Sequence, residues 1–196
     1  MAEAIYETPG EKFSQGDIFE LLPHSYIEPP LLMLAQEAGS EAILRLSPEP
    51  FVSFNDKDGQ RIVSMCKRGK GIILSHGCVI DKPQVRRWLV CPVIPLTEIP
   101  SGQRGDVKRN RAYSMLYLPQ IREVLPESFV YLDQVSTIDA EIVRSAHRLV
   151  SLSDIGRKAL FAQFIRSLTR WELRTIACPN CQMDINQSEA LPVKTP

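Results

Sequence analysis

Two short apolar runs separated by a polar loop constrain the fold of this chain more than any other feature. The first run is Gly71-Ile72-Ile73-Leu74, and the second is W-L-V-C-P-V-I-P-L at 88–96. Runs of this length, rich in Ile and Val and bounded by Gly and Pro, are typical of buried strands. Sequential strands usually pair, so we expect the two runs to be neighbours in a sheet. The loop between them carries chemically capable side chains: Ser75, His76, Cys78 and Asp81.

The same pattern recurs along the first three quarters of the chain. The predicted strands are 16–21, 51–54, 61–65, 71–75, 88–95 and 129–132, with further candidates at 31–34, 42–46, 113–118 and 148–150. Asp58-Gly59 supplies the residues that a tight hairpin turn requires, so 51–54 and 61–65 are predicted to pair. Polar residues and glycines indicate a loose arm at 1–12, a turn at 67–70 and a loop at 97–111.

From Ser153 the apolar residues follow helical spacing instead. Ser153 and Asp154 suit a helix start because their oxygens accept hydrogen bonds from free amides, and the helix is predicted to span 153–174. Short strands followed by one long helix predict a mainly β fold: a small SH3-like barrel with extra hairpins and one long C-terminal helix. The expected organisation is a barrel-like domain at 1–150, a packed helix at 151–176, and a C-x-x-C segment with a flexible tail at 177–196.

Composition limits the classes of partner and the compartment. Lys plus Arg equals Asp plus Glu at 23 each, so any affinity for nucleic acid must come from local clusters. No apolar run approaches the length that spans a bilayer, so no membrane partner is expected. The first residues show no basic and apolar leader, and the number of cysteines is odd. These features predict a cytoplasmic protein with reduced thiols.

The order of several short motifs resembles the MazF/PemK toxin family. The motifs are Gly16-Asp17-Ile18, a basic Lys70, Ile72-Ile73-Leu74-Ser75 and Pro95-Leu96-Thr97. The resemblance covers about a third of the chain. It implies an SH3-like barrel, usually dimeric, that cuts single-stranded RNA. The chain departs from the family in having Lys70-Gly71 where Arg-Pro is usual, and in the long segment before the central strands.

RNA cleavage without a metal needs a base, an acid and a cation. The resemblance implies Lys70 as the cation and Thr97 as a phosphate-binding hydroxyl, and His76 could add acid–base capacity near neutral pH. The alternative is that Lys70 is a turn lysine and Thr97 caps a strand. The loop after Leu74 and the segment 95–97 are predicted to meet at one rim of the barrel. Cys78 with His76 also offers a thiolate nucleophile, against the alternative of a buried structural cysteine.

Two further features suggest binding. Cys178-Pro179-Asn180-Cys181 is half of a zinc ribbon, in which Cys178 and Cys181 would need further ligands from this chain or a second subunit. The alternative is a pair of unmetallated thiols, so zinc stays open. Basic residues cluster in a loop and along one face of the predicted helix, where they could follow a phosphate backbone or remain solvated. They are Arg104, Lys108, Arg109, Arg111, Arg166, Arg170 and Arg174.

Two functions remain from the sequence. The first is a MazF/PemK-like nucleic-acid-binding protein that acts as an endoribonuclease on single-stranded RNA. The second is a non-catalytic binding or assembly module on the same barrel, within a homodimer or a larger complex. The order of the strands favours the first, whereas Lys70-Gly71 and the long insertion favour the second.

Overall fold

The structure is a computed structural model that describes residues 2–26, 31–35, 43–47, 61–63, 65–170, 175–177 and 184–186. Contacts divide the chain into two units: one formed by 1–22 and 68–196, and one formed by 23–67. The second unit lies inside the stretch predicted as one barrel-like domain, 1–150, and the sequence interpretation did not separate it. None of the described helices has the length and apolar character needed to cross a membrane.

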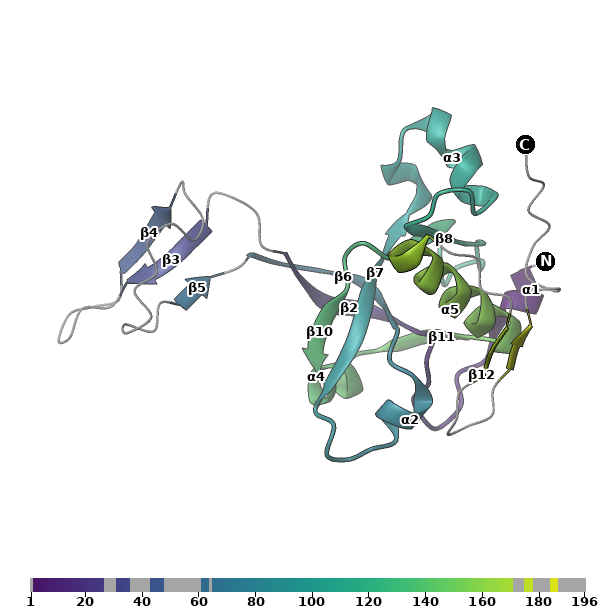
Figure 1. Ribbon diagram of the computed structural model, residues 1–196, viewed down its shortest axis with the longest axis horizontal. Coiled ribbons are helices and arrows are strands. Elements are labelled where there is room, and N and C mark those ends of the chain that lie inside the picture. The colour runs from purple at the N-terminus through teal and green to yellow at the C-terminus, as the bar shows by residue number, and fades with distance from the viewer. Residues whose placement is uncertain are drawn as a thin grey trace. The chain divides into compact units, whose positions relative to one another are not determined.

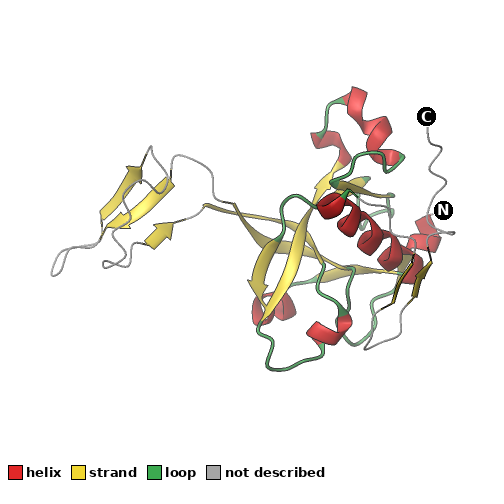
Figure 2. Cartoon of the chain, in the orientation of Figure 1, coloured by secondary structure: helices red, strands yellow, loops and turns green. Residues whose placement is uncertain are grey.

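The first unit is built on an eight-stranded antiparallel sheet, in which β10 (Ser136–Asp139) pairs with β7 beside the main path (Figures 1 and 2). A mainly β architecture is therefore confirmed. The strand order has two ends, so among the described residues the sheet is not closed into a barrel. The main path, in order, is β1 (Tyr6–Glu7), β11 (Arg148–Leu152), β2 (Asp17–Tyr26), β6 (Met65–Ile73), β7 (Arg87–Pro95), β9 (Ser128–Tyr131) and β8 (Met115–Leu118).

Both faces of the central strands are buried, which explains why their sequences are apolar throughout. Ile72 and Ile73 are each fully buried but belong to different hydrophobic clusters, because successive side chains of a strand point to opposite faces. The first cluster includes Leu160 of the helix α5 (Asp154–Thr169). The second includes residues of α2 (Gly77–Ile80) and α4 (Ala140–Ser145), packed around the fully buried Trp88.

The register of β6 against β7 corrects one expectation about the site. Gly71 pairs with Pro92 and Ile73 pairs with Val90, in an antiparallel arrangement. The loop after Leu74 therefore lies beside the start of β7, where the Leu74 amide donates to the Leu89 carbonyl at 2.8 Å. The prediction that this loop meets 95–97 at one rim is wrong, because antiparallel pairing puts those segments at opposite ends of β7.

The C-terminal helix begins as predicted and ends earlier. The Ser153 hydroxyl accepts from the Gly156 amide at 3.2 Å and caps the first turn of α5. The helix ends at Thr169 because Arg170 adopts the left-handed conformation, with φ 57°. The predicted helix residues 171–174 lie outside the described part of the chain.

Three segments predicted as irregular are ordered elements. Residues 2–5 form α1 (Ala2–Ile5) and lead into β1, whose Tyr6 pairs with Leu152 of β11. Residues 67–70 continue β6 instead of forming a turn. The predicted loop 97–111 contains the short helix η1 (Leu96–Glu98) and α3 (Ser101–Lys108), which packs against β8.

The second unit contains a three-stranded antiparallel sheet of β4 (Ile43–Ser47), β3 (Leu31–Ala35) and β5 (Arg61–Val63). Strands near 31–34 and 42–46 are thus confirmed, and Leu34 pairs with Leu44. The predicted strand 51–54 lies outside the described residues. Near the C-terminus, β12 (Thr175–Ala177) pairs with β13 (Asp184–Asn186).

Candidate functional site

The register of β6 and β7 brings two of the predicted catalytic residues toward the same end of the sheet. Lys70 precedes Gly71, which pairs with Pro92, and Thr97 lies two residues beyond Pro95, the last residue of β7. Lys70 is half-buried and Thr97 is exposed in η1. The Thr97 carbonyl accepts from Arg104 Nη2 at 3.0 Å, so α3 holds this end of β7 in place.

His76 lies at the opposite end of β7 and has a local structural task. Its Nδ1 accepts from the Cys78 amide at 3.2 Å, which makes it the N-cap of α2. Ser75 holds the same end, because its hydroxyl accepts from the Leu89 amide at 2.7 Å. The structure therefore separates His76 from Lys70 and Thr97 along the length of β7 and favours a capping role for it.

The predicted basic loop is largely engaged by neighbouring groups. Lys108 Nζ lies 2.7 Å from a carboxylate oxygen of Glu127. Asp106 lies 3.3 Å from Arg109 Nη2 and 3.9 Å from Arg111 Nη1. Arg104 donates to backbone carbonyls instead of standing free in solvent. Arg109 and Arg111 remain exposed, so their ion pairs are weak and open to competition from phosphate.

Tyr113 gathers the two arginines at the end of α5 that the structure describes. The guanidinium carbon of Arg166 lies 4.5 Å from the centroid of the Tyr113 ring, and that of Arg170 lies 5.6 Å from it. Tyr113 is nevertheless 44% exposed. The ring was not singled out from the sequence as a site residue. We call Tyr113, Arg166 and Arg170 the Tyr113 surface; Arg174 lies outside the described residues.

A hydrogen-bonded cluster of titratable side chains adjoins Thr97, and no sequence motif indicated it. The Glu127 carboxylate accepts from the Tyr117 hydroxyl at 2.5 Å and from Lys108 Nζ at 2.8 Å. The Glu127 carbonyl accepts from the Leu96 amide at 2.8 Å, which places Glu127 beside the residue that precedes Thr97. We call Thr97, Arg104, Lys108, Tyr117 and Glu127 the Glu127 cluster.

The interactions within this cluster shift the pKa values of Glu127 and Tyr117 in opposite directions. Hydrogen bonds from Lys108, and next from Tyr117, lower the pKa of Glu127, so its carboxylate stays ionised into mildly acidic solution. Burial and then the hydrogen bond to Glu127 raise the pKa of Tyr117 to about 12. The shared proton therefore remains on the phenol in the free protein.

One residue connects the Tyr113 surface to the Glu127 cluster. The Asn110 carbonyl accepts from Arg166 Nη1 at 3.1 Å, and its side-chain oxygen accepts from the Tyr117 amide at 2.8 Å. Asn110 adopts a positive φ of 50°, a conformation that Asn tolerates better than most residues. Asn110 thus links the arginine end of α5 to the strand that carries Tyr117.

The proposed zinc ligands Cys178 and Cys181 lie outside the described residues, in the segment that joins β12 to β13. Within the described part of the chain, no group of three or more His, Cys, Asp or Glu side chains could hold a metal ion. Cys91 is a buried cysteine, and this burial raises the pKa of its thiol to about 12. Such a thiol keeps its proton, so zinc binding by this chain stays a prediction that rests on Cys178 and Cys181.

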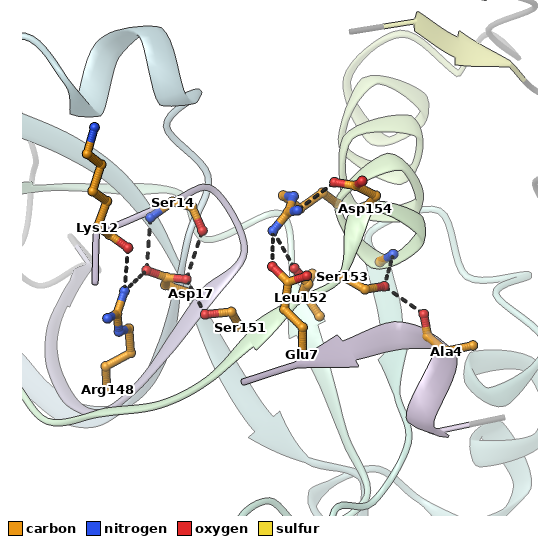
Figure 3. Close-up of polar contacts among 12 residues, drawn as sticks. Ala4, Glu7, Lys12, Ser14, Asp17, Arg148, Ser151, Leu152, Ser153 and Asp154 are labelled. Carbon is orange, nitrogen blue, oxygen red and sulfur yellow. Dashed lines mark hydrogen bonds and ion pairs between the residues drawn. The ribbon is translucent and has the colours of Figure 1, made fainter. Parts of the chain in front are cut away.

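The motif Gly16-Asp17-Ile18, which carries part of the family resemblance, serves the fold. The fully buried Asp17 carboxylate accepts from the Ser14 amide and hydroxyl, from Ser151 and from Arg148 (Figure 3). Ile18 lies in the first hydrophobic cluster. These contacts assign the motif to stability and not to the candidate site.

Comparison of the chain with protein-family models, with curated proteins and with solved structures found no match.

Proposed function

We propose that the protein binds single-stranded RNA and cleaves it as an endoribonuclease of the MazF/PemK kind. Its antiparallel sheet would then be a relative of the SH3-like barrel. The observation that carries the proposal is the Tyr113 surface. An exposed aromatic ring with guanidinium groups beside it offers stacking for an unpaired base and charge for the adjacent phosphates. Double-stranded nucleic acid hides its base faces and gains less from such a surface.

The second part of the proposal is that the protein cleaves the RNA that it binds. Lys70 and Thr97 both lie toward the end of β7 that adjoins α3, and this placement supports a shared phosphate contact. Lys70 would supply positive charge to the phosphorane, and Thr97 would supply a hydroxyl to a phosphate oxygen. The resemblance also implies a homodimer, in which two copies would present two such regions to one RNA strand.

RNA affinity should fall when side chains of the Tyr113 surface are removed. Tyr113→Ala and Arg170→Ala are each expected to weaken binding of a fluorescein-labelled single-stranded RNA by about tenfold, since stacking and phosphate contacts are each worth roughly 1–3 kcal/mol. Fluorescence anisotropy at several salt concentrations measures both effects. Only Arg170→Ala should also reduce the salt dependence, because it alone removes a cation.

Arg86→Ala is the matched control for charge. Arg86 is exposed, pairs with Asp139, and lies next to the start of β7, at the end opposite Thr97. The Arg86→Ala substitution should leave RNA affinity unchanged, although it changes the net charge by the same amount as Arg170→Ala. If Arg86→Ala weakens binding equally, the binding is unspecific charge attraction and the Tyr113 surface is not the site.

Removing Lys70 should impair cleavage more than binding. Lys70→Ala is expected to lower the cleavage rate at least tenfold, because a cation beside the phosphorane is lost. Cys78→Ser is the comparison at the other end of β7 and should leave cleavage intact. Denaturing gel electrophoresis of end-labelled RNA measures both rates. Cleavage that survives Lys70→Ala but is lost in Cys78→Ser would place the chemistry at the α2 loop.

A non-catalytic binding or assembly module is the second candidate. The observation in its favour is that Glu127, Asp106 and backbone carbonyls already engage the cations of α3 and the following loop. A protein that binds no single-stranded RNA even at low salt would support this candidate and exclude the first.

A further inference from the structure

RNA cleavage by the attack of a 2′-hydroxyl needs a proton acceptor and a proton donor, and the roles assigned to Lys70 and Thr97 include neither. Lys70 is a cation and Thr97 is an alcohol, while His76 caps α2 at the far end of β7. The acid–base groups must therefore come from other residues near Thr97. Among the described residues, the Glu127 cluster is a group of titratable side chains in direct contact with that end of β7.

We infer that Glu127 and Tyr117 form the acid–base pair of this centre, with Lys108 as its local cation. The inference rests on the proposed function and adds residues that the family resemblance did not indicate. Glu127 is a carboxylate with 37% of its side chain exposed, so it is accessible to an RNA hydroxyl. Tyr117 is half-buried and donates directly to that carboxylate.

The chemistry closes without a metal or another reactant. The 2′-oxygen attacks phosphorus and its proton passes to the Glu127 carboxylate. The bond between phosphorus and the 5′-oxygen breaks, and the leaving oxygen takes the phenolic proton of Tyr117, because an alkoxide is more basic than a phenolate. The hydrogen bond between Glu127 and Tyr117 then returns the proton from the carboxylic acid to the phenolate. The products are a 2′,3′-cyclic phosphate end and a 5′-hydroxyl end, and the protein is unchanged.

The surrounding contacts suit this task. Lys108 lies one helical turn after Arg104 on α3, so both cations face the segment that carries Thr97. Their positive charge stabilises the additional negative charge that develops on the phosphorane oxygens. Asn110 fixes the backbone of Tyr117 and contacts Arg166, so RNA held at the Tyr113 surface would lie next to the cluster.

The test uses the full chain and single-stranded RNA oligonucleotides of varied sequence. Glu127→Gln and Tyr117→Phe should each lower the cleavage rate about a hundredfold or more, as expected for loss of a general base or acid. RNA affinity should stay within about threefold of wild type, because neither group is needed to hold the strand. Mass spectrometry should find cyclic phosphate ends, and a 2′-deoxy nucleotide at the cut site should abolish cleavage.

The pH dependence of the cleavage rate distinguishes a role of Glu127 and Lys108 in the acid–base chemistry from a purely structural role. Cleavage should fall at acidic pH as Glu127 becomes protonated, and this fall should lie below the usual range of a Glu because Lys108 lowers its pKa. In Lys108→Ala the pKa of Glu127 rises, so the acidic fall of the residual activity should move to higher pH. A structural role of Lys108 would change the rate without moving this fall.

Glu123→Gln is the matched control, because Glu123 is an exposed carboxylate in the same connection between β8 and β9. The Glu123→Gln variant should cleave RNA at the wild-type rate. If Glu127→Gln and Tyr117→Phe also cleave normally, the inference is overturned while RNA cleavage stands. If the intact protein binds RNA but never cuts it, the inference falls and the binding proposal survives. If it neither binds nor cuts, both fall.

Discussion

Replacing Asp17 by alanine is expected to lower the free energy of unfolding by about 3–5 kcal/mol, the usual cost of removing one partner of a buried ion pair. Asp17 is fully buried, and its carboxylate lies 2.8 Å from Arg148 Nη1. Without it, the Arg148 guanidinium would remain in a largely buried position without its counter-charge, and Ser14 and Ser151 would each lose an acceptor. Urea denaturation followed by tryptophan fluorescence measures the loss, because Trp88 is fully buried in an adjacent core.

The network also holds the segment before β2, which raises the expected cost. Arg148 donates to the carbonyls of Gly10 and Lys12 and stacks over the ring of Phe13 at 5.0 Å. Asp106→Ala is the matched control, because Asp106 is an exposed carboxylate with two arginine partners. Its removal should change stability by less than about 1 kcal/mol. Equal effects of the two substitutions would show that burial of Asp17 contributes nothing special.

A double variant identifies the source of the loss. Arg148→Met removes the charge that Asp17→Ala leaves unpaired, so the combined variant should be more stable than the sum of the two single losses predicts. A strictly additive result would mean that the two side chains do not depend on each other. In that case the serine hydrogen bonds would account for the effect of Asp17.

The buried strands were predictable because their signal is local. Gly71-Ile72-Ile73-Leu74 is apolar at every position, and the structure buries both Ile72 and Ile73 on opposite faces of one sheet. The start of α5 was equally clear, because Ser153 precedes a helical apolar pattern and does cap it. Its end was not, because Arg170 takes a left-handed conformation for which Gly is the usual signal.

Elements held by distant contacts escaped prediction. α3 buries Val107 and is otherwise polar with two glycines, so it shows little apolar periodicity. Hydrogen bonds from Arg104 to the carbonyls of Thr97 and Ile99 help to hold α3 in place. Residues 1–12 contain Pro9-Gly10 and were interpreted as an arm, although Tyr6 belongs to the first hydrophobic cluster. Neither set of contacts can be deduced from local spacing.

The candidate site shows the same limit. Lys70 and Thr97 were found through motifs, and the antiparallel register of β6 and β7 turns them toward one end. The Glu127 cluster joins α3, β8 and the start of β9, and no motif links its members. Its partners are defined only by which strands pair, since Leu118 pairs with Ser128 and so brings Tyr117 and Glu127 together.

The second large effect is expected at Gly156, where a methyl group should destabilise a helix that alanine normally favours. An added Cβ would lie 2.4 Å from the carbonyl oxygen of Ile5 and 3.0 Å from Leu152 Cβ. Ile5 is held in place because its carbonyl accepts from the Ser153 amide at 2.8 Å. The N-terminal segment would have to move away from α5 and disturb the pairing of Tyr6 with Leu152.

Gly156→Ala should therefore lower the free energy of unfolding by about 2–3 kcal/mol, because the cost of overpacking exceeds the roughly 1 kcal/mol that alanine gains in a helix. Gly102→Ala in α3 is the matched control, since a Cβ there meets nothing within 4 Å. It should raise stability by up to about 1 kcal/mol, so the two substitutions are expected to differ in sign. Thermal denaturation measures both, and hydrogen exchange at the Ser153 amide should accelerate only in Gly156→Ala. Stabilisation by both substitutions would show that α1 and β1 do not pack against α5 as described.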